Sequence, residues 1–292
     1  MITGRIIRGV GGFYTLEDEK GAAYICKARG RFRRDGVKPV VGDMVTFEPG
    51  AEGDEGFIAA ILDRKNEMVR PALANIDRFV MVIAAQSPQP DLVLADRLML
   101  CAAMMGIEQL LCVNKCDLSL GTYEMLEKEY AYSGIKVIKT SAHTGFGLDE
   151  LKVELVSGIS AFAGQSGAGK SSLINALCPN ADMEIGDISR IERGRHTTRH
   201  SELIKLGPGG WIIDTPGFSL FELESQDPSS FMQYYEEMLP YEGECRFLSC
   251  QHLSEPGCAV RAAGEEKGFS ARLERYSALY NEAKQKWEKR YD

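Results

Sequence analysis

The stretch Gly164–Ser171 reads GQSGAGKS and decides the fold of the central part of the chain. It follows an apolar segment, Ile159–Ala163, and precedes a segment with helical spacing, Lys170–Leu177. Glycines permit a tight loop whose N–H groups approach phosphate oxygens, and a helix N-terminus favours anions. The pattern predicts a phosphate-binding loop made of Gly164, Gln165, Ser166, Gly167, Ala168, Gly169, Lys170 and Ser171. We expect Lys170 to reach the β- and γ-phosphates and the Ser171 hydroxyl to ligate Mg²⁺.

A second phosphate-side motif, DTPG, begins at Asp214 directly after the apolar Trp211–Ile213. A carboxylate at the end of a strand is placed to support Mg²⁺, so Asp214 is a magnesium candidate. The N–H of Gly217 is expected to face a γ-phosphate. D-x-x-G alone is also an ordinary turn, and it gains its weight from the phosphate loop nearby.

The motif NKCD at residues 114–117 follows an apolar strand candidate, Glu108–Val113. It matches the N-K-x-D pattern that recognises guanine, in which the Asp carboxylate accepts two hydrogen bonds that adenine cannot donate. A second small motif, TSA at residues 140–142, follows the strand candidate Lys136–Lys139 and is expected to complete the base pocket. The candidate base-binding residues are therefore Asn114, Lys115, Cys116, Asp117, Ser141 and Ala142.

The order of these motifs is unusual, because the base motifs precede the phosphate loop along the chain. In an ordinary GTPase the phosphate loop comes first and the base motif last. The same sheet can form if the chain ends are moved to other surface positions, since domain termini often lie close together. The sequence therefore predicts a circularly permuted GTPase domain.

The segment Gly194–His200, GRHTTRH, lies between the two phosphate motifs and suits a switch loop. We expect Thr198, or failing that Thr197, to ligate Mg²⁺ in the GTP state; the alternative is a solvated basic loop. Phe218 stands where many GTPases carry a Gln that orients the attacking water. His196 is the nearest residue with a suitable group, so it is the candidate catalytic residue.

Residues 1–70 predict an all-β barrel of the OB type, because short alternating segments are separated by Gly, Pro and Asp clusters. The basic run from Lys27 to Arg34 surrounds one aromatic residue. It predicts an RNA contact in which the cations neutralise phosphates and Phe32 stacks on a base; the alternative is a solvated loop balanced by Asp35. The candidate RNA contacts are Lys27, Arg29, Arg31, Phe32, Arg33 and Arg34.

Beyond residue 220 the β pattern stops, and Phe231–Met238 and Ser270–Arg290 have helical spacing. Between them lie three cysteines and one histidine, a usual ligand set for structural zinc. Four protein ligands leave no position for a catalytic water, so we expect one structural Zn²⁺ that stabilises the folded domain. The candidate ligands are Cys245, Cys250, His252 and Cys258.

The composition sets the remaining bounds. The 292 residues carry 34 basic and 42 acidic side chains, a net charge of −8, which excludes a uniformly basic nucleic-acid coat. No apolar run approaches the ~18 residues that a membrane span needs, so we expect a soluble cytoplasmic protein without a membrane partner. The predicted fold class is multidomain α/β: an OB-type barrel (1–70), a permuted GTPase domain with a parallel sheet covered by helices on both faces (71–220) and a mainly helical zinc domain (221–292).

The whole chain resembles the RsgA/YjeQ/YloQ family of circularly permuted GTPases. The matching segments are 114–117, 164–172 (which adds Ser172 to the phosphate-binding residues), 194–198, 214–217 and the Cys/His set. The resemblance implies a role in late maturation of the 30S ribosomal subunit, hydrolysis of GTP to GDP stimulated by that subunit, contacts to 16S rRNA and a catalytic role for His196. We expect a monomer. The alternative function is an RNA-binding GTPase switch with a non-ribosomal partner.

Overall fold

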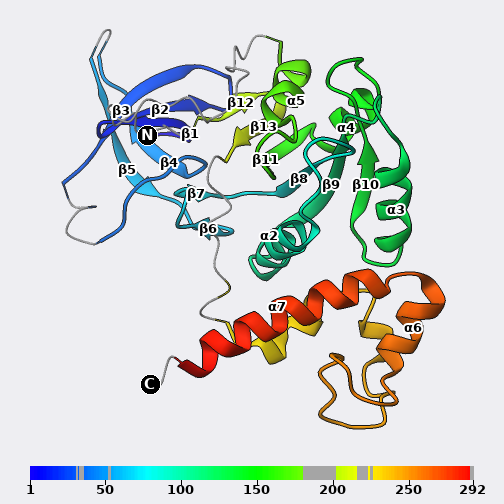
Figure 1. Cartoon of the computed structure of the whole chain (residues 1–292). Helices are drawn as coiled ribbons and strands as arrows, with labels where there is room; N and C mark the ends of the chain where they lie inside the picture. The colour runs from blue at the N-terminus through cyan, green and yellow to red at the C-terminus, as the bar shows by residue number, and fades with distance from the viewer. Residues whose placement is uncertain are drawn as a thin grey trace, which may run out of the picture.

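A computed structural model describes residues 1–30, 32, 36–51, 54–179, 202–215, 223 and 226–289. Figure 1 shows a β-barrel formed by the N-terminal part, a sheet flanked by helices in the centre and a helical C-terminal part beneath it. Within the described residues, each helix is too short or too polar to cross a lipid bilayer.

The N-terminal part is a closed barrel with the strand order β1-β2-β3-β5-β4. Alternate side chains point inward, and Ile6, Leu16, Val45, Phe47 and Ile58 are fully buried in its core. Strands β3 and β5 pair in parallel and all other neighbours pair antiparallel. This confirms the predicted barrel. The strands are β1 (Ile2–Val10), β2 (Phe13–Asp18), β3 (Ala23–Ala28), β4 (Met44–Glu48) and β5 (Gly56–Ile61).

A short ribbon connects the barrel to the central sheet. It consists of β6 (Glu67–Met68) and β7 (Leu73–Ala74), which pair antiparallel. Leu73 also forms a bridge with Val41 of the barrel. The ribbon thus crosses residue 70, where the sequence suggested a domain boundary, and its second strand still packs on the barrel.

The central sheet has the order β10-β9-β8-β11-β13-β12. Its first five strands run parallel, and only the edge strand β12 is antiparallel, because a tight turn joins it to β13. The strands are β8 (Arg78–Ala84), β9 (Glu108–Asn114), β10 (Lys136–Lys139), β11 (Ser157–Ala163), β12 (Ile204–Lys205) and β13 (Gly209–Asp214). The chain runs outward from β8 through β9 to β10, returns to β11 beside β8, and continues on the other side.

Helices cover both faces of this sheet, as predicted. In β8, Phe79, Met81 and Ile83 join the core that contains α2, whereas Val80 and Val82 join the core that contains α4 and α5. This alternation is the period of two that a strand buried on both faces requires. The helices are α2 (Leu92–Met104), α3 (Gly121–Glu129), α4 (Leu148–Glu154) and α5 (Lys170–Leu177).

The C-terminal part packs α7 (Ser270–Lys289) against α2, α6 (Ala259–Lys267) and a 3-10 helix, η3 (Pro228–Tyr234). The sequence suggested a helix at Phe231–Met238. The structure corrects this: the helical turn begins at Pro228, which Asp227 caps by accepting from the Ser229 N–H, and it ends at Tyr234. A second short 3-10 helix is η4 (Leu239–Tyr241).

A buried ionic network joins α7 to the helices of the central sheet. Arg275 pairs with Asp96 of α2, and its guanidinium lies 2.7 Å from the carboxylate of Glu129 in α3. Asp96 also accepts from the Tyr130 hydroxyl. Burial opposes the charge of Arg275, but Asp96 and its neighbours outweigh this and raise its pKa above the usual value. Arg272, over the Tyr130 ring at 4.2 Å, extends the network.

The barrel is joined to the opposite end of the sheet, at β12. The Leu203 N–H donates to the Ile7 carbonyl at 2.8 Å, and Arg8 and Glu202 form an antiparallel bridge. Lys205 of β12 pairs with Glu17 of β2. The residues just before the edge strand β12 therefore pair with β1 of the barrel.

Candidate nucleotide and metal sites

The predicted motifs converge at one edge of the central sheet. They follow β10, β9, β11 and β13, whose carboxyl ends lie in register: Val113 beside Lys139, and Phe162 beside Asp214. Strands β8 and β11 are neighbours, and the chain order diverges between them. In open α/β sheets, ligands bind at the carboxyl ends of the strands at such a switch point.

Asn114 connects three of these loops although it is almost completely buried. Its Nδ2 donates to the Ala168 carbonyl of the phosphate loop at 3.0 Å. Its Oδ1 accepts from the N–H of Ala142 at 3.1 Å. The amide thus holds the two base motifs and the phosphate loop in one arrangement, which sequence spacing alone did not reveal.

Lys115 makes a second connection, to the loop that follows β8. Its Nζ donates to the Gly167 carbonyl at 2.8 Å and to the Ser87 carbonyl. The loop after β8 was missed in the sequence analysis. The signal for it was present, because polar residues follow the buried strand end there, as they do after the other strands.

Asn114 and Lys115, with the loops that they connect, are called the hub below. The remaining base-motif residues form turns beside it. Cys116 is buried, and its thiol donates to the Val113 carbonyl at 3.2 Å. Asp117 lies exposed in the turn that begins at Lys115. Ser141 is buried, and its hydroxyl accepts from the Thr144 N–H at 3.1 Å. The carboxylate proposed to read the base is thus the accessible member of the set.

Two glycines of the phosphate loop stand where a side chain cannot fit. A Cβ on Gly164 would lie 2.1 Å from the Val82 carbonyl oxygen, and φ is +142°. A Cβ on Gly169 would lie 2.3 Å from the Asn114 Nδ2, and φ is +93°. Position 169 therefore requires glycine, because a larger residue would collide with the Asn114 amide that anchors the base motif.

Lys170 folds back over the loop, donating to the carbonyls of Gly164 at 2.7 Å and Gln165 at 3.0 Å. Burial lowers its pKa, and the charge of Asp214 opposes that shift. Ser171 follows Lys170 in the first turn of α5. A hydroxyl and a carboxylate are oxygen ligands of the kind that Mg²⁺ prefers, so these residues fit that ion.

Other members of the loop are less enclosed. The Gln165 Oε1 accepts from the N–H of Asp91, which caps α2, at 3.3 Å. Ser166 is exposed and Ser172 is half-buried in the first turn of α5. His196, Thr197, Thr198 and Gly217 lie outside the described residues.

The cysteine and histidine cluster is assembled as the spacing predicts. The Cys245 Sγ lies 3.6 Å from the His252 Nδ1 and 3.9 Å from the Cys258 Sγ, and Nδ1 lies 3.4 Å from the Cys258 Sγ. With Cys250, all four ligand atoms lie within 4.8 Å of one another, so the cluster could hold a metal ion. Tetrahedral Zn–S bonds of about 2.3 Å place sulfurs about 3.8 Å apart, which fits this arrangement.

The surroundings of the cluster were not predicted. The His252 Nε2 faces the Met232 thioether of η3 at 3.0 Å, so Nδ1 is the nitrogen turned to the thiols. Burial raises the pKa of the Cys250 thiol to about 12. Metal binding must therefore displace the proton from this thiol.

The basic run on the barrel is only partly as expected. Lys27 and Arg29 are accessible and pair with Glu55 and Glu48. Phe32, however, is 8% exposed and belongs to the main core, so the expected stacking role is corrected: this ring is used for packing. Arg31, Arg33 and Arg34 lie outside the described residues.

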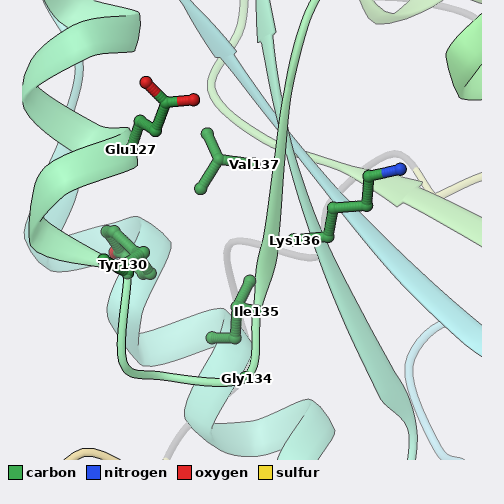
Figure 2. Close-up of a pocket in the computed structure, with 7 residues that line it drawn as sticks. Glu127, Tyr130, Gly134, Ile135, Lys136 and Val137 are labelled. Carbon is green, nitrogen blue, oxygen red and sulfur yellow. The ribbon is translucent and has the colours of Figure 1, made fainter.

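A hollow of about 410 Å³ lies between the end of α3 and the start of β10, lined by Glu127, Tyr130, Ala131, Gly134, Ile135, Lys136 and Val137. Figure 2 shows these residues around it. Lys136 points to the other side of the strand from Glu127 and Val137. The hollow lies at the amino end of β10, whereas the predicted base motif follows the carboxyl end. It is therefore separate from the nucleotide site.

Comparison with known proteins agrees with this geometry. A family model described as RsgA GTPase matches residues 61–224, and one described as RsgA N-terminal domain matches residues 3–58. The chain is 44% identical to the small ribosomal subunit biogenesis GTPase RsgA of Ruminiclostridium cellulolyticum, covering 97% of this chain and 94% of that protein. It is 42% identical to the protein of the same name from Caldanaerobacter subterraneus subsp. tengcongensis, covering 99% and 98%.

Solved structures give the same result. The crystal structure of YjeQ from Thermotoga maritima has a TM-score of 0.82 at 33% identity, covering 97% of this chain and 98% of that one. YloQ, described as a circularly permuted GTPase, has a TM-score of 0.79 at 29% identity, covering 98% and 96%. The fold and the arrangement of the motifs define a circularly permuted GTPase. The chain belongs to the RsgA GTPase family.

Proposed function

We propose that this GTPase acts in biogenesis of the small ribosomal subunit, by binding the subunit in one nucleotide state and leaving it after hydrolysis. The relatives reported above are named for that process. The observation that carries the nucleotide site is Asn114, whose amide joins both base motifs to the phosphate loop.

Guanine recognition is assigned to the hub and its exposed carboxylate. Asp117 accepts the two guanine N–H donors, while Asn114 and Lys115 keep the surrounding loops in place. Ser141 and Ala142 close the pocket from the β10 side. Adenine would leave the Asp117 acceptors unpaired, which selects GTP over ATP.

Phosphate binding is assigned to residues 164–172. Lys170, now bonded to two loop carbonyls, would exchange those bonds for phosphate oxygens. Mg²⁺ would be held by Ser171 with support from Asp214, and by Thr198 from the switch segment. When bound, the ion neutralises charge that develops on the phosphates. Gly217 would offer its N–H to the γ-phosphate.

Hydrolysis transfers the γ-phosphoryl group to water and yields GDP and inorganic phosphate. We assign His196 to hold the attacking water, because Phe218 cannot. Glu202, six residues after His196, is bridged to Arg8 of the barrel, so the chain that follows the switch segment is attached to the barrel.

The flanking parts are assigned supporting roles. The barrel contacts 16S rRNA through its basic run, with Lys27 and Arg29 exchanging glutamates for phosphates. One structural Zn²⁺ held by the Cys/His cluster stabilises the C-terminal part. We retain the division into 1–70, 71–220 and 221–292, and propose a monomer that works in the cytoplasm, where its subunit partner would be assembled.

The test is GTP hydrolysis by the purified, zinc-containing protein with and without purified small subunits. We expect slow hydrolysis alone and a strong rise with small subunits. Large subunits are the control and should have no effect. Equal stimulation by naked RNA would instead support an RNA-activated switch with a different partner.

A further inference from the structure

Three side chains lie side by side on the outer face of the barrel. Phe13 of β2 is paired with Lys27 of β3, and Lys27 is paired with Phe57 of β5. Their sequence neighbours Tyr14, Cys26 and Ile58 point into the core, so these three point outward. We name them the outer row.

The two rings of the outer row are accessible. Phe13 is 40% exposed and Phe57 is 46% exposed, and Ile25 on the same face of β3 is 57% exposed. The outer face of a barrel is normally polar, so two aromatic rings on the strands that flank β3 suggest a contact surface.

Two cations lie on this face, each paired with a glutamate. The Lys27 Nζ lies 4.6 Å from the centre of the Phe13 ring and 2.7 Å from the Glu55 carboxylate. Arg29, two residues on, pairs with Glu48. Exposed pairs of this kind contribute little free energy, so a phosphate can replace the glutamates at small cost.

The outer row is turned away from the rest of the molecule. The barrel meets the central sheet through Ile7, Arg8 and Glu17, and Glu17 lies at the opposite end of β2 from Phe13. Figure 1 shows β3 and β5 on the flank of the barrel away from β13. A partner can therefore approach the row while the sheet binds nucleotide.

We propose that the outer row is a stacking platform for unpaired RNA bases. One base stacks on Phe13 and another on Phe57, and Lys27 contacts the phosphate backbone between them. Neighbouring strands are about 4.8 Å apart, so the rings stand about 10 Å apart, far enough for each to take its own base. Bases in a duplex are stacked on one another and cannot offer these faces.

This proposal rests on the proposed function, which supplies a partner that contains RNA, and it replaces the stacking role first expected of Phe32. The barrel would then bind single-stranded RNA by stacking of bases on its aromatic rings, with little dependence on base identity.

The experiment measures binding of a fluorescein-labelled oligouridylate to the full-length, zinc-containing protein by anisotropy at fixed salt. The variant F13L/F57L keeps the apolar character but removes the rings, and we expect its affinity to fall at least about tenfold. The variant F13W/F57W should keep or improve affinity, and its tryptophan fluorescence should be quenched on binding. Val153→Ala, an exposed apolar residue on α4, is the control and should bind like wild type.

Three results would overturn the platform. They are wild-type affinity in F13L/F57L, equal losses in the Leu and Trp variants, or equal competition by duplex RNA. If F13L/F57L bound oligouridylate normally yet lost small subunits, the surface would serve a protein contact instead. Stimulation of wild-type hydrolysis by small subunits is measured separately, so failure of the platform and failure of the proposed function give different results.

Discussion

Asn114 belongs to a base-recognition motif, and its side chain also holds loops of the protein together. Its pattern is read as a base-recognition signal, yet in the structure both ends of its amide bind loops of the protein itself. A buried amide with both ends satisfied holds a unique geometry, because any other arrangement leaves an unpaired polar group. The hub thus makes the base and phosphate sites one unit.

Gly169 is the residue where this unit is least tolerant. Gly169→Ala adds a Cβ that would meet the Asn114 amide and occupies a backbone conformation that L-residues avoid. We expect the free energy of unfolding to fall by about 1–3 kcal/mol and GTP affinity to fall with it. Urea unfolding and nucleotide titration measure the two effects.

The matched control is Gly207→Ala, at a position where a new Cβ meets no atom within 4 Å. It should leave both quantities nearly unchanged. Wild-type GTP affinity in Gly169→Ala would contradict the role of the hub.

Asp117 carries a separate prediction about base choice. Asp117→Asn replaces the double acceptor with a group that also donates, so guanine loses its complement and xanthine gains one. We expect GTP affinity to fall roughly hundredfold or more while xanthosine triphosphate binds better. Competition binding measures this. Asp149→Asn, whose side chain is fully exposed, is the control, and unchanged GTP use by Asp117→Asn would remove the base-pocket assignment.

At the scale of elements, α2 links the nucleotide edge to the C-terminal part. Its N-cap Asp91 contacts Gln165 of the phosphate loop, and one turn further on Asp96 pairs with Arg275 of α7. Burying the Asp96 carboxylate alone would be unfavourable, and its partners compensate for this. The helix is therefore a rigid connection between two sites that are distant in sequence.

Removing one cation of this network, Arg275, should be costly. Arg275→Met would leave Asp96 and Glu129 buried without the guanidinium that pairs with both, and we expect it to lower the free energy of unfolding by about 3–5 kcal/mol. Lys152→Met, which breaks an exposed pair with Asp149, should change it by less than about 1 kcal/mol. Urea unfolding followed by circular dichroism compares them; equal effects would mean that the network adds nothing.

The elements also show what the sequence could and could not predict. Spacing gave the barrel, the parallel strands and the metal cluster, because each follows from local periodicity or from ligands close in sequence. Phe32 could not be placed, since a ring in a basic loop turns inward or outward according to the tertiary packing. The Asn114 contact to Ala168 joins residues 54 positions apart, and only the folded sheet brings them together.

At the scale of the whole molecule, the metal cluster and α7 should act together. Cys101 of α2 packs in the same core as α7, and burial raises its pKa to about 12. Chelation of the metal should loosen the C-terminal helices and open Cys101 to iodoacetamide, together with Cys245, Cys250 and Cys258. Mass spectrometry of the labelled cysteines measures this.

Cys112 provides an internal control. It lies in the core between the sheet and helices α4 and α5, and burial also raises its pKa to about 12. It should stay unlabelled after chelation, and nucleotide binding should be partly retained. Labelling of both residues would show that the whole protein unfolds, and labelling of neither would show that the C-terminal part stays docked without metal.

The join between β1 and β12 has a further consequence for solubility. A sheet that ends in an open strand offers unpaired N–H and C=O groups to any other chain, which is a common route to aggregation. Here the Leu203 N–H is already taken by the Ile7 carbonyl, and the barrel covers that border. Without its first seventy residues, the chain would leave this N–H unpaired at the edge of the sheet. We expect such a chain to self-associate, so the barrel also limits aggregation of the protein.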